Sequence, residues 1–221
     1  MEIIKHPAKY NDAFLPIFAQ YLQEYVKVLD PMAGTGKIAQ IRQFGWNGHL
    51  ICNEIEPEWR NNLYLIDEWH FDDASNLSWC EDSSIDAICT SPTYGNRMAD
   101  HHHAKDTSHR ITYTHYLGHD LNEENTGKMQ WGEQYRQKHL AIWKECYRIL
   151  RNQGLFILNI SNHIRKGKMI NVCKWHTQIC KDLNFHLMKE LRIQTPRSRY
   201  GENYEKRVTS EKILIFQKEK S

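Results

Sequence analysis

The stretch Val26–Ile38 constrains the fold most, because a mostly apolar run leads there directly into closely spaced glycines. Val26–Leu29 is typical of a strand that is buried on both faces. Gly34 and Gly36 follow, and the next residues favour a helix. A strand that passes through glycines into a helix lets backbone N–H groups approach a ligand at the carboxyl edge of a parallel sheet. The stretch therefore predicts a ligand site at that edge.

Two common phosphate-binding motifs do not match this stretch. The glycines have the spacing Gly-x-Gly, without the third glycine of the dinucleotide-binding fingerprint. Lys37 is followed by Ile38, where a P-loop has Ser or Thr. Neither motif therefore explains the loop.

The loop resembles a motif of one enzyme family. Residues 30–36 read Asp-Pro-Met-Ala-Gly-Thr-Gly, which is similar to the Asp-Pro-Phe-x-Gly-Ser-Gly loop of S-adenosylmethionine-dependent amino-methyltransferases. These enzymes methylate exocyclic amines of bases in DNA. The resemblance implies that S-adenosylmethionine is the cofactor and that five loop residues contact it: Asp30, Met32, Ala33, Gly34 and Gly36.

A second motif of the family lies before the loop. Residues 6–10 read His-Pro-Ala-Lys-Tyr, which is similar to the His-Pro-x-Lys-Phe entry to a helix beside the methionine end of the cofactor. The resemblance implies cofactor contacts at His6, Pro7 and Lys9. Residues 12–25 then carry apolar side chains at helical spacing and predict that helix.

An acidic residue follows the second predicted buried strand, Leu50–Asn53. At the end of such a strand, about 20 residues past the glycines, a carboxylate can accept hydrogen bonds from both ribose hydroxyls. The segment resembles the family's Gly-Val-Glu-Ile-Asp-Pro-Glu-Tyr, which places this role on Glu54. Ile55 or Trp59 would cover the adenine ring, although core packing explains Trp59 equally well. Asp73 lies where the family has the Asp that bonds the adenine amino group.

The fourth predicted strand, Ser84–Thr90, ends in Ser91-Pro92-Thr93-Tyr94. This resembles the family's catalytic signature, [Asp/Asn/Ser]-Pro-Pro-[Tyr/Phe/Trp]. An exocyclic amine is a poor nucleophile because its lone pair is delocalised into the ring. Ser91 and the carbonyl of Pro92 can accept both amine hydrogens and localise that lone pair for in-line attack on the sulfonium methyl. Tyr94 would stack on the base, which must be flipped out of a duplex.

Three details of the signature bear on the reaction. Thr93 replaces the second proline, whose fixed φ would constrain the turn, so either activity or substrate is affected. Ser91 is commoner in cytosine-N4 members, and Asp or Asn in adenine members, which slightly favours cytosine. A cytosine-C5 mechanism needs a cysteine nucleophile after proline in this loop. The chain has no Pro-Cys, and Cys89 lies inside the predicted strand.

The segment 95–132 is long, polar and without clear periodicity. Six histidines fall within the 19 residues from His101 to His119, but no Cys pair or His-Glu-x-x-His accompanies them. Their spacing does not match metal ligands, so we expect no metal site. Because the segment follows the catalytic turn, it predicts a lid or a nucleic-acid-contacting loop, in which Arg97 and Arg110 meet phosphates.

Basic residues gather in the C-terminal part. Residues 160–221 hold 14 Lys or Arg and 6 Asp or Glu, against 15 and 21 in residues 1–159. Such a part suggests a face for a polyanion, and a solvated lysine-rich surface explains the charge equally well. Within it, the loop 195–208 interleaves basic and tyrosine side chains, a combination that binds phosphates and stacks on bases. Its candidate nucleic-acid contacts are Arg197, Arg199 and Tyr200.

The remaining elements complete an alternating pattern. We predict helices at 133–150 and 169–183, a fifth strand at 155–160, and closing strands at 185–194 and 212–218. The pattern predicts an α/β fold: a doubly wound, seven-stranded, mostly parallel sheet with a closing antiparallel strand pair. The resemblance, which covers roughly residues 5–160, implies the same class I methyltransferase fold. Residues 1–221 fit one domain, without a separate target-recognition domain.

Composition limits the compartment. No run of about 18 apolar residues is present, so we expect no membrane span, and the N-terminus is too polar for a signal peptide. The six cysteines are scattered, without a Cys-x-x-Cys pair. They are typical of reduced thiols in a cytoplasmic protein.

Three functional hypotheses follow. The first is a DNA cytosine-N4 or adenine-N6 methyltransferase that uses S-adenosylmethionine. The second is an RNA guanine-N2 or adenine-N6 methyltransferase, which shares the signature and often lacks a separate DNA-reading domain. The third is a relative that binds cofactor or nucleic acid but has lost catalysis, as Thr93 would indicate.

Overall fold

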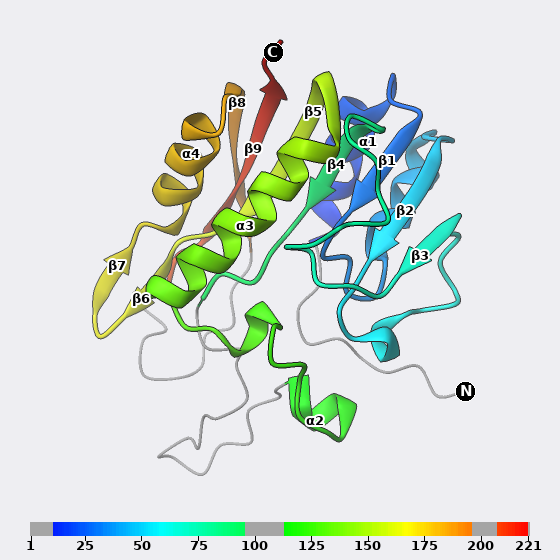
Figure 1. The fold of residues 1–221 in the computed structure, drawn as a ribbon. Helices are drawn as coiled ribbons and strands as arrows, with labels where there is room; N and C mark the ends of the chain where they lie inside the picture. Colours follow the sequence, from blue (N-terminus) through cyan, green and yellow to red (C-terminus); the bar gives the residue numbers. More distant parts are fainter. Residues whose placement is uncertain (1–10, 96–112, 196–206, 221) are drawn as a thin grey trace.

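The computed structural model describes residues 11–95, 113–195 and 207–220. Its main feature is a seven-stranded sheet with the strand order β3-β2-β1-β4-β5-β9-β8 (Figure 1). The strands are β1 Lys27–Asp30, β2 His49–Asn53, β3 Glu68–His70, β4 Ile85–Thr90, β5 Leu150–Ile160, β8 Phe185–Gln194 and β9 Ser210–Lys218. The first five strands in this order, β3, β2, β1, β4 and β5, pair in parallel, and β9 runs antiparallel to both β5 and β8. The predicted fold class is therefore confirmed.

The order of the strands reverses beside β1. This strand pairs in parallel with β2 on one side and with β4 on the other. The chain thus leaves β1 toward one edge of the sheet and returns through β4 to the other. In sheets of this kind, ligands bind outside the carboxyl ends of the strands at such a switch point. Here those ends are Asp30 and Thr90.

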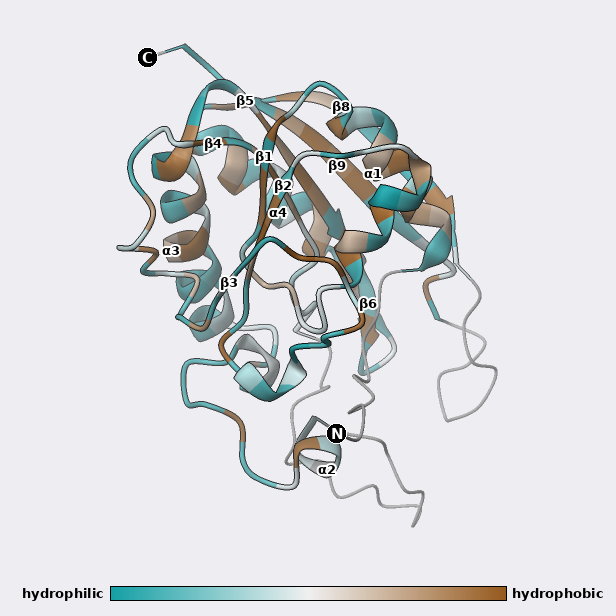
Figure 2. Ribbon diagram, turned by 90° about the vertical axis from the view of Figure 1, so that its right-hand side faces the viewer, coloured by the Kyte–Doolittle hydropathy of each residue, from teal (hydrophilic) through white to brown (hydrophobic). Residues whose placement is uncertain are grey.

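Helices cover both faces of the sheet. Two of them, α3 (Glu133–Ile149) and α4 (Val172–Asp182), pack on one face, and α1 (Leu15–Leu22) and the 3₁₀ helix η2 (Lys37–Phe44) pack on the other (Figure 1). Alternate residues of β5 enter the two cores, because successive side chains of a strand point to opposite faces. The central strands are accordingly apolar along most of their length (Figure 2).

Several boundaries differ from the sequence-based expectation. The predicted helix at 12–25 begins with a 3₁₀ turn, η1 (Asp12–Phe14), before α1. The expected helix at 169–183 begins only at Val172. Before it lies an unpredicted hairpin of β6 (His163–Arg165) and β7 (Lys168–Ile170). Its two turn residues, Lys166 and Gly167, have φ of 50° and 72°, as the tightest hairpin turns require.

The described part of the 95–132 segment, residues 113–132, lies near the carboxyl edge of the parallel strands. It contains the short helix α2 (Tyr113–Leu117) and the 3₁₀ helix η4 (Thr126–Lys128), at the end of the molecule where the carboxyl ends of the parallel strands lie (Figure 1). Trp59, of the 3₁₀ helix η3 (Pro57–Trp59), is buried against residues of this segment. The carboxylate of Glu56 accepts hydrogen bonds from the Asn122 backbone N–H and the Asn125 amide at 2.7 and 2.8 Å. The segment is thereby attached directly after β2.

All six cysteines are buried free thiols. In the described part of the chain, no helix has the length and apolar character needed to cross a membrane.

Candidate active site

The glycine loop after β1 is closely packed against β2 and β3. The backbone N–H of Ala33 donates to the carbonyl of Asn53 at 2.9 Å, which fixes the loop beside the end of β2. Gly34 and Gly36 have φ of 54° and 76°, a region that other residues rarely adopt. A Cβ atom on Gly36 would lie 2.2 Å from the side chain of Ile66. Both glycines are therefore required by backbone conformation, and Gly36 also by close approach.

Glu54 lies against this loop. Its carboxylate accepts hydrogen bonds from the backbone N–H groups of Gly34 at 2.8 Å and Glu56 at 3.2 Å. Burial raises the pKa of Glu54 to about 7, although the two backbone hydrogen bonds act to lower it. The structure thus joins two residues that the sequence connected to the cofactor only through separate motifs.

Asp73 lies beyond the next strand and is fixed by its own partners. Its two carboxylate oxygens accept hydrogen bonds from the Ser75 backbone N–H and hydroxyl at 2.9 and 2.8 Å, and Lys138 of α3 forms an ion pair with it. Burial acts to raise the pKa of Asp73, but these hydrogen bonds hold it below its usual value. Asn53 bonds the backbone of Asp72 at 2.9 and 3.0 Å, so this turn is attached to the end of β2.

The turn after β4 brings together four polar side chains from distant parts of the sequence. The Tyr94 hydroxyl lies 3.1 Å from that of Ser91 and donates to Glu211 of β9 at 2.8 Å. The amide oxygen of Asn159 on β5 lies 3.1 Å from the Ser91 hydroxyl and 3.2 Å from the Tyr94 hydroxyl. We call Ser91, Tyr94, Asn159 and Glu211 the polar cluster. It lies at the carboxyl end of β4, directly beside that of β1.

Thr93, which stands in place of the second proline, has a hydrogen-bond partner at its carbonyl and another at its hydroxyl. Its carbonyl accepts a hydrogen bond from the Tyr135 hydroxyl at 2.7 Å, and its hydroxyl donates to that of Thr126 at 3.0 Å. The Tyr135 hydroxyl also lies 3.0 Å from Nε2 of His176, whose Nδ1 accepts from the Trp143 indole at 3.0 Å. Burial lowers the pKa of His176 well below its usual value, so the ring is neutral. A neutral ring that accepts at Nδ1 donates from Nε2 to Tyr135.

The residues that support this turn were not among the predicted site residues. Asn159 interrupts an apolar strand, and that is a signal the sequence does contain. Glu211 gives no comparable signal, because it lies at the start of its strand, directly after a polar and charged segment. Tyr135 and His176 fall on the apolar faces of their helices, where the pattern indicates only core packing.

The other predicted site residues divide into two groups. Asp30 and Pro92 are buried, and the Asp30 carboxylate accepts a hydrogen bond from the Met32 backbone N–H at 3.1 Å. Met32 and Ile55 are half-buried, and Met32 packs against the core on the α3 face. The remaining predicted contacts lie outside the described residues: His6, Pro7, Lys9, Arg97, Arg110, Arg197, Arg199 and Tyr200. Among the described residues, no cluster of potential metal ligands is found.

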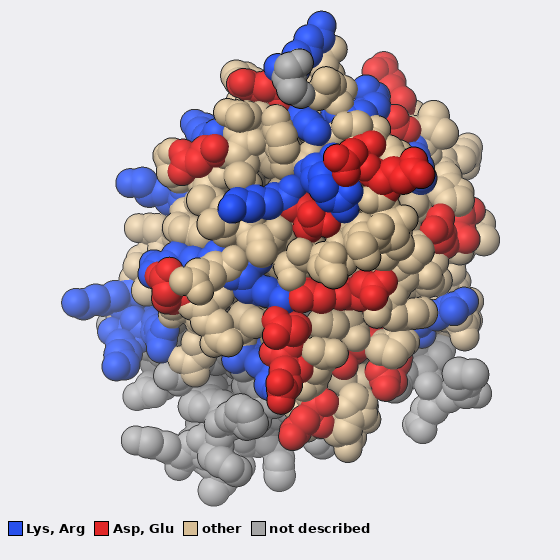
Figure 3. Space-filling view, viewed as in Figure 1, with Lys and Arg blue, Asp and Glu red and all other residues tan. Residues whose placement is uncertain are grey.

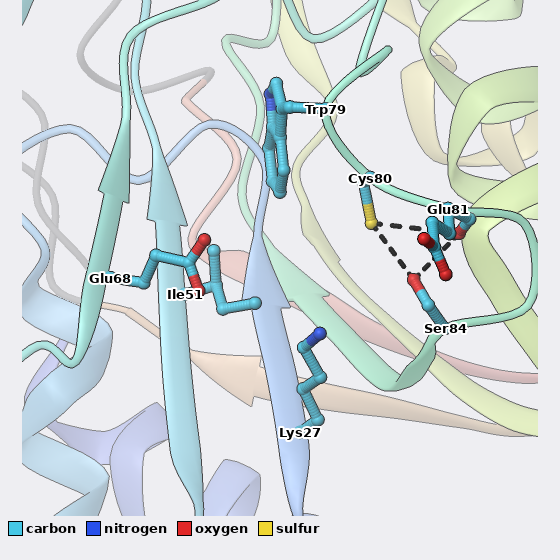
Figure 4. A pocket seen from close by; sticks show the side chains of 7 residues that line it. All are labelled: Lys27, Ile51, Glu68, Trp79, Cys80, Glu81 and Ser84. Atoms are coloured by element: carbon cyan, nitrogen blue, oxygen red, sulfur yellow. Dashed lines mark hydrogen bonds between the residues drawn. The ribbon is translucent and has the colours of Figure 1, made fainter.

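A cavity of about 320 Å³ lies on the α3 face at the opposite end of the sheet (Figure 4). Lys27 and Glu68, the first residues of β1 and β3, line it, together with Ser84, which directly precedes β4. These positions are the amino ends of parallel strands. The cavity is therefore separate from the glycine loop and the polar cluster.

Solved structures with a similar fold come from several organisms. They include a SAM-dependent methyltransferase from Methanosarcina mazei (16% identity, 93% of this chain and 98% of that chain, TM-score 0.57). A methyltransferase from Pyrococcus furiosus has 13% identity over 99% of this chain and 89% of that chain, with a TM-score of 0.58. The Burkholderia thailandensis 1,6-didemethyltoxoflavin-N1-methyltransferase, solved with S-adenosylhomocysteine, has 13% identity over 95% and 78%, with a TM-score of 0.54. At these identities the likeness concerns the fold.

The sequence itself identifies the family. A comparison with curated proteins gave no match. A family model described as DNA methylase, of the N6/N4 methyltransferase type, matches residues 85–221, which is more than half of the chain and includes the Ser91 turn and β9. The chain belongs to the N6/N4 DNA methylase family and is an S-adenosylmethionine-dependent methyltransferase.

Proposed function

We propose that this enzyme transfers a methyl group to an exocyclic amino nitrogen of a base in DNA, at N4 of cytosine or N6 of adenine. The observation that carries the proposal is the adjacency of the glycine loop after β1 and the Ser91 turn after β4, which are neighbouring parallel strands. A cofactor on the first and an amine on the second would therefore meet at one sheet edge.

The residues around the glycine loop fit S-adenosylmethionine. Ile66 and Trp69 fill the space where a side chain of Gly36 would lie, which holds the loop close against β3, and the buried Glu54 carboxylate lies next to the loop at Gly34. Glu54 would accept hydrogen bonds from the ribose hydroxyls, and Asp73, near the end of β3, would bond the adenine amino group. When bound, the cofactor supplies an electrophilic methyl group on a sulfonium.

The protein groups act on the base. The Ser91 hydroxyl oxygen and the carbonyl of Pro92 accept the two hydrogens of the amine, and the nitrogen lone pair becomes available toward the methyl group. The nitrogen–carbon bond would form as the carbon–sulfur bond breaks, and the nitrogen would then release one of its hydrogens to solvent as a proton. Tyr94 positions the base through its ring. Because this reaction needs orientation and fixed acceptors more than an acid–base pair, hydrogen-bond geometry accounts for most of the effect. Ser91 is the residue type commoner in cytosine-N4 members of the family, which favours cytosine as the target.

The β6–β7 hairpin supports a nucleic-acid substrate. It follows β5 directly, at the same end of the molecule as the catalytic turn, and Lys166 and Lys168 are exposed on it. Arg165 attaches the hairpin to the backbone carbonyl of Trp131 at 2.9 Å, and the Trp131 N–H donates to the carbonyl of Gly95 at 3.0 Å. Lys and Arg side chains gather where β6 and β7 lie (Figure 3). These cations would meet backbone phosphates beside the catalytic turn.

Methyl transfer from radiolabelled cofactor tests the proposal. Duplex DNA, single-stranded DNA and total RNA are offered separately, and the labelled nucleoside is identified. We expect label in N4-methylcytosine or N6-methyladenine of DNA. Label only in RNA would move the enzyme to the RNA base methyltransferases, and no label with cofactor still bound would indicate a catalytically silent relative.

A matched pair of variants connects the label to the site. Ser91→Ala should lower kcat by about 10²–10³-fold, the usual loss for one preorganised hydrogen-bonding group, while cofactor affinity changes little. Ser84→Ala removes the same atom at the amino end of β4, far from the turn, and should keep full activity. Equal activity of the two variants would contradict the role of Ser91.

A further inference from the structure

The polar cluster contains a carboxylate that the chemistry above does not use. Glu211 is the second residue of β9 and is only 8% exposed, although it is charged. It is 120 residues from Ser91 in the sequence and is joined to it in space through Tyr94. A buried carboxylate is costly unless it accepts hydrogen bonds, so its place beside the catalytic turn calls for a reason.

The direction of the hydrogen bonds in the cluster follows from what each group can do. An ionised carboxylate only accepts, so Tyr94 donates its single hydroxyl hydrogen to Glu211, the shortest contact of the cluster at 2.8 Å. The Tyr94 oxygen then remains an acceptor. The hydroxyl hydrogen of Ser91 can point to Tyr94 or to Asn159, both 3.1 Å away.

Asn159 is oriented so that its amide oxygen accepts hydrogen bonds within the polar cluster. Its amide nitrogen faces the carbonyl of Lys212, at 3.4 Å, which leaves its oxygen toward the hydroxyls of Ser91 and Tyr94. The cluster therefore presents two acceptors, the Asn159 oxygen and the Tyr94 oxygen, to the one hydrogen of Ser91. With that hydrogen taken inside the protein, the lone pairs of the Ser91 oxygen remain for the hydrogens of the substrate amine.

We propose that Glu211 is a positioning residue of the methyl transfer, which acts through the Tyr94 hydroxyl to keep Ser91 a hydrogen-bond acceptor for the substrate amine. This inference rests on the proposed function, because it assumes that Ser91 meets the amine. Glu211 does not touch the substrate in this arrangement. Its negative charge also favours the positive charge that develops on the attacking nitrogen, at a distance and in a poorly screened part of the protein.

Glu211→Gln tests the proposal with almost no change of shape. The amide can donate to Tyr94 as well as accept, so the direction of the hydrogen bonds is no longer fixed. We expect kcat to fall about tenfold, the effect of one hydrogen-bond network of ordinary strength. KM for DNA and the Kd of the cofactor should stay within about twofold of wild type. Substitution of a residue that only supports folding would lower the yield or the melting temperature and would not lower kcat at an unchanged KM.

A double-mutant cycle decides whether the effect passes through Tyr94. Tyr94→Phe keeps the ring that positions the base and removes the hydroxyl that connects Glu211 to Ser91. If Glu211 acts through that hydroxyl, Glu211→Gln should cost less than about twofold in the Tyr94→Phe background. If Glu211→Gln lowers kcat about tenfold in the Tyr94→Phe background as well, the two substitutions act independently and the proposal is overturned. A wild-type kcat in Glu211→Gln would also overturn it.

Controls separate this inference from the proposed function. Glu190→Gln removes a carboxylate from β8, where Glu190 pairs with Lys212 on the neighbouring strand, and should leave kcat unchanged. If wild type methylates a polynucleotide and Ser91→Ala is inactive while Glu211→Gln is fully active, only the role of Glu211 fails. If wild type methylates no polynucleotide, the proposed function fails and this inference fails with it.

Discussion

The Tyr135 hydroxyl donates a 2.7 Å hydrogen bond to the carbonyl of Thr93, at the position where the catalytic signature usually has its second proline. Proline restricts a turn through its own φ. Here the restraint comes from outside the turn, through a buried helix residue that is itself bonded to His176. Where Thr93 replaces the proline, a hydrogen bond from a distant residue thus restrains the backbone of the same turn.

Tyr135→Phe tests that restraint. It leaves the Thr93 carbonyl and the buried His176 Nε2–H without their partner, so we expect a loss of about 1–3 kcal/mol in the free energy of unfolding. Because the freed carbonyl belongs to the catalytic turn, kcat should fall as well, at unchanged cofactor affinity. Tyr147→Phe, about three turns further along α3, is the control. An unaltered kcat in a destabilised Tyr135→Phe would limit Tyr135 to a packing role.

Gly36→Ala should damage the cofactor loop for two separable reasons. The φ of 76° strains any residue with a Cβ atom, and that atom would overlap Ile66. Gly45→Ala has the strain alone, since its φ is 91° and nothing lies within 4 Å of the added atom. In denaturant unfolding, we expect Gly45→Ala to lower the free energy of unfolding by about 1 kcal/mol and Gly36→Ala to lower it by clearly more. Cofactor affinity should be lost only in Gly36→Ala. Equal costs would mean that the loop adjusts to the added atom.

The raised pKa of Glu54, about 7, predicts a pH dependence of stability. A carboxyl group whose folded pKa lies above its unfolded value of about 4.5 stabilises the protein below pH 4.5. That contribution is lost as the pH rises toward and through 7, and it amounts to at most about 3 kcal/mol. Urea unfolding of wild type should therefore lose stability between pH 5 and 8 relative to Glu54→Gln. Parallel pH curves for the two proteins would contradict the shift.

Cofactor binding should show the opposite trend. The ionised Glu54 is the better acceptor for ribose hydroxyls, so the affinity for S-adenosylmethionine should rise between about pH 6 and 8 in wild type. In Glu54→Gln the affinity should be weaker, by about tenfold, and nearly independent of pH. Calorimetric titration at three pH values measures both. A variant that binds as tightly as wild type at pH 8 would remove Glu54 from the proposed cofactor site.

The β6–β7 hairpin gives a prediction that does not need catalysis. If Lys166 and Lys168 each meet a phosphate, replacing both by Gln should reduce the slope of log K against log salt by about 1.8 for duplex DNA. Lys181→Gln with Lys189→Gln, two exposed positions on α4 and β8, is the control for total charge. Binding titrations between 50 and 200 mM salt on the Ser91→Ala background separate affinity from turnover. Identical slopes in the two double variants would assign the hairpin no phosphate contact.

Local patterns predicted most of the fold. The apolar runs at β1, β2, β4 and β5 and the amphipathic stripes of α1, α3 and α4 are strong signals because burial on one or two faces imposes a period. The short strand β3 and the β6–β7 hairpin were missed. Each of these three strands has only three residues, too few for a period, and the pairing partner determines whether such residues become a strand.

The sequence by itself determined the class of fold, the family and the cofactor, and it predicts where the catalytic turn lies, because these depend on residues that are contiguous in the chain. Only the tertiary structure decided that Glu54 contacts Gly34 and that Ser91 shares hydrogen bonds with Asn159 and Glu211. The physical reason is that parallel strands place their carboxyl ends side by side whatever their separation in sequence, and that the antiparallel β9 places its amino end beside the carboxyl end of β5. Which side chain accepts a hydrogen bond from which donor at that edge depends on strand order and register, and neither can be predicted from any one segment of the sequence.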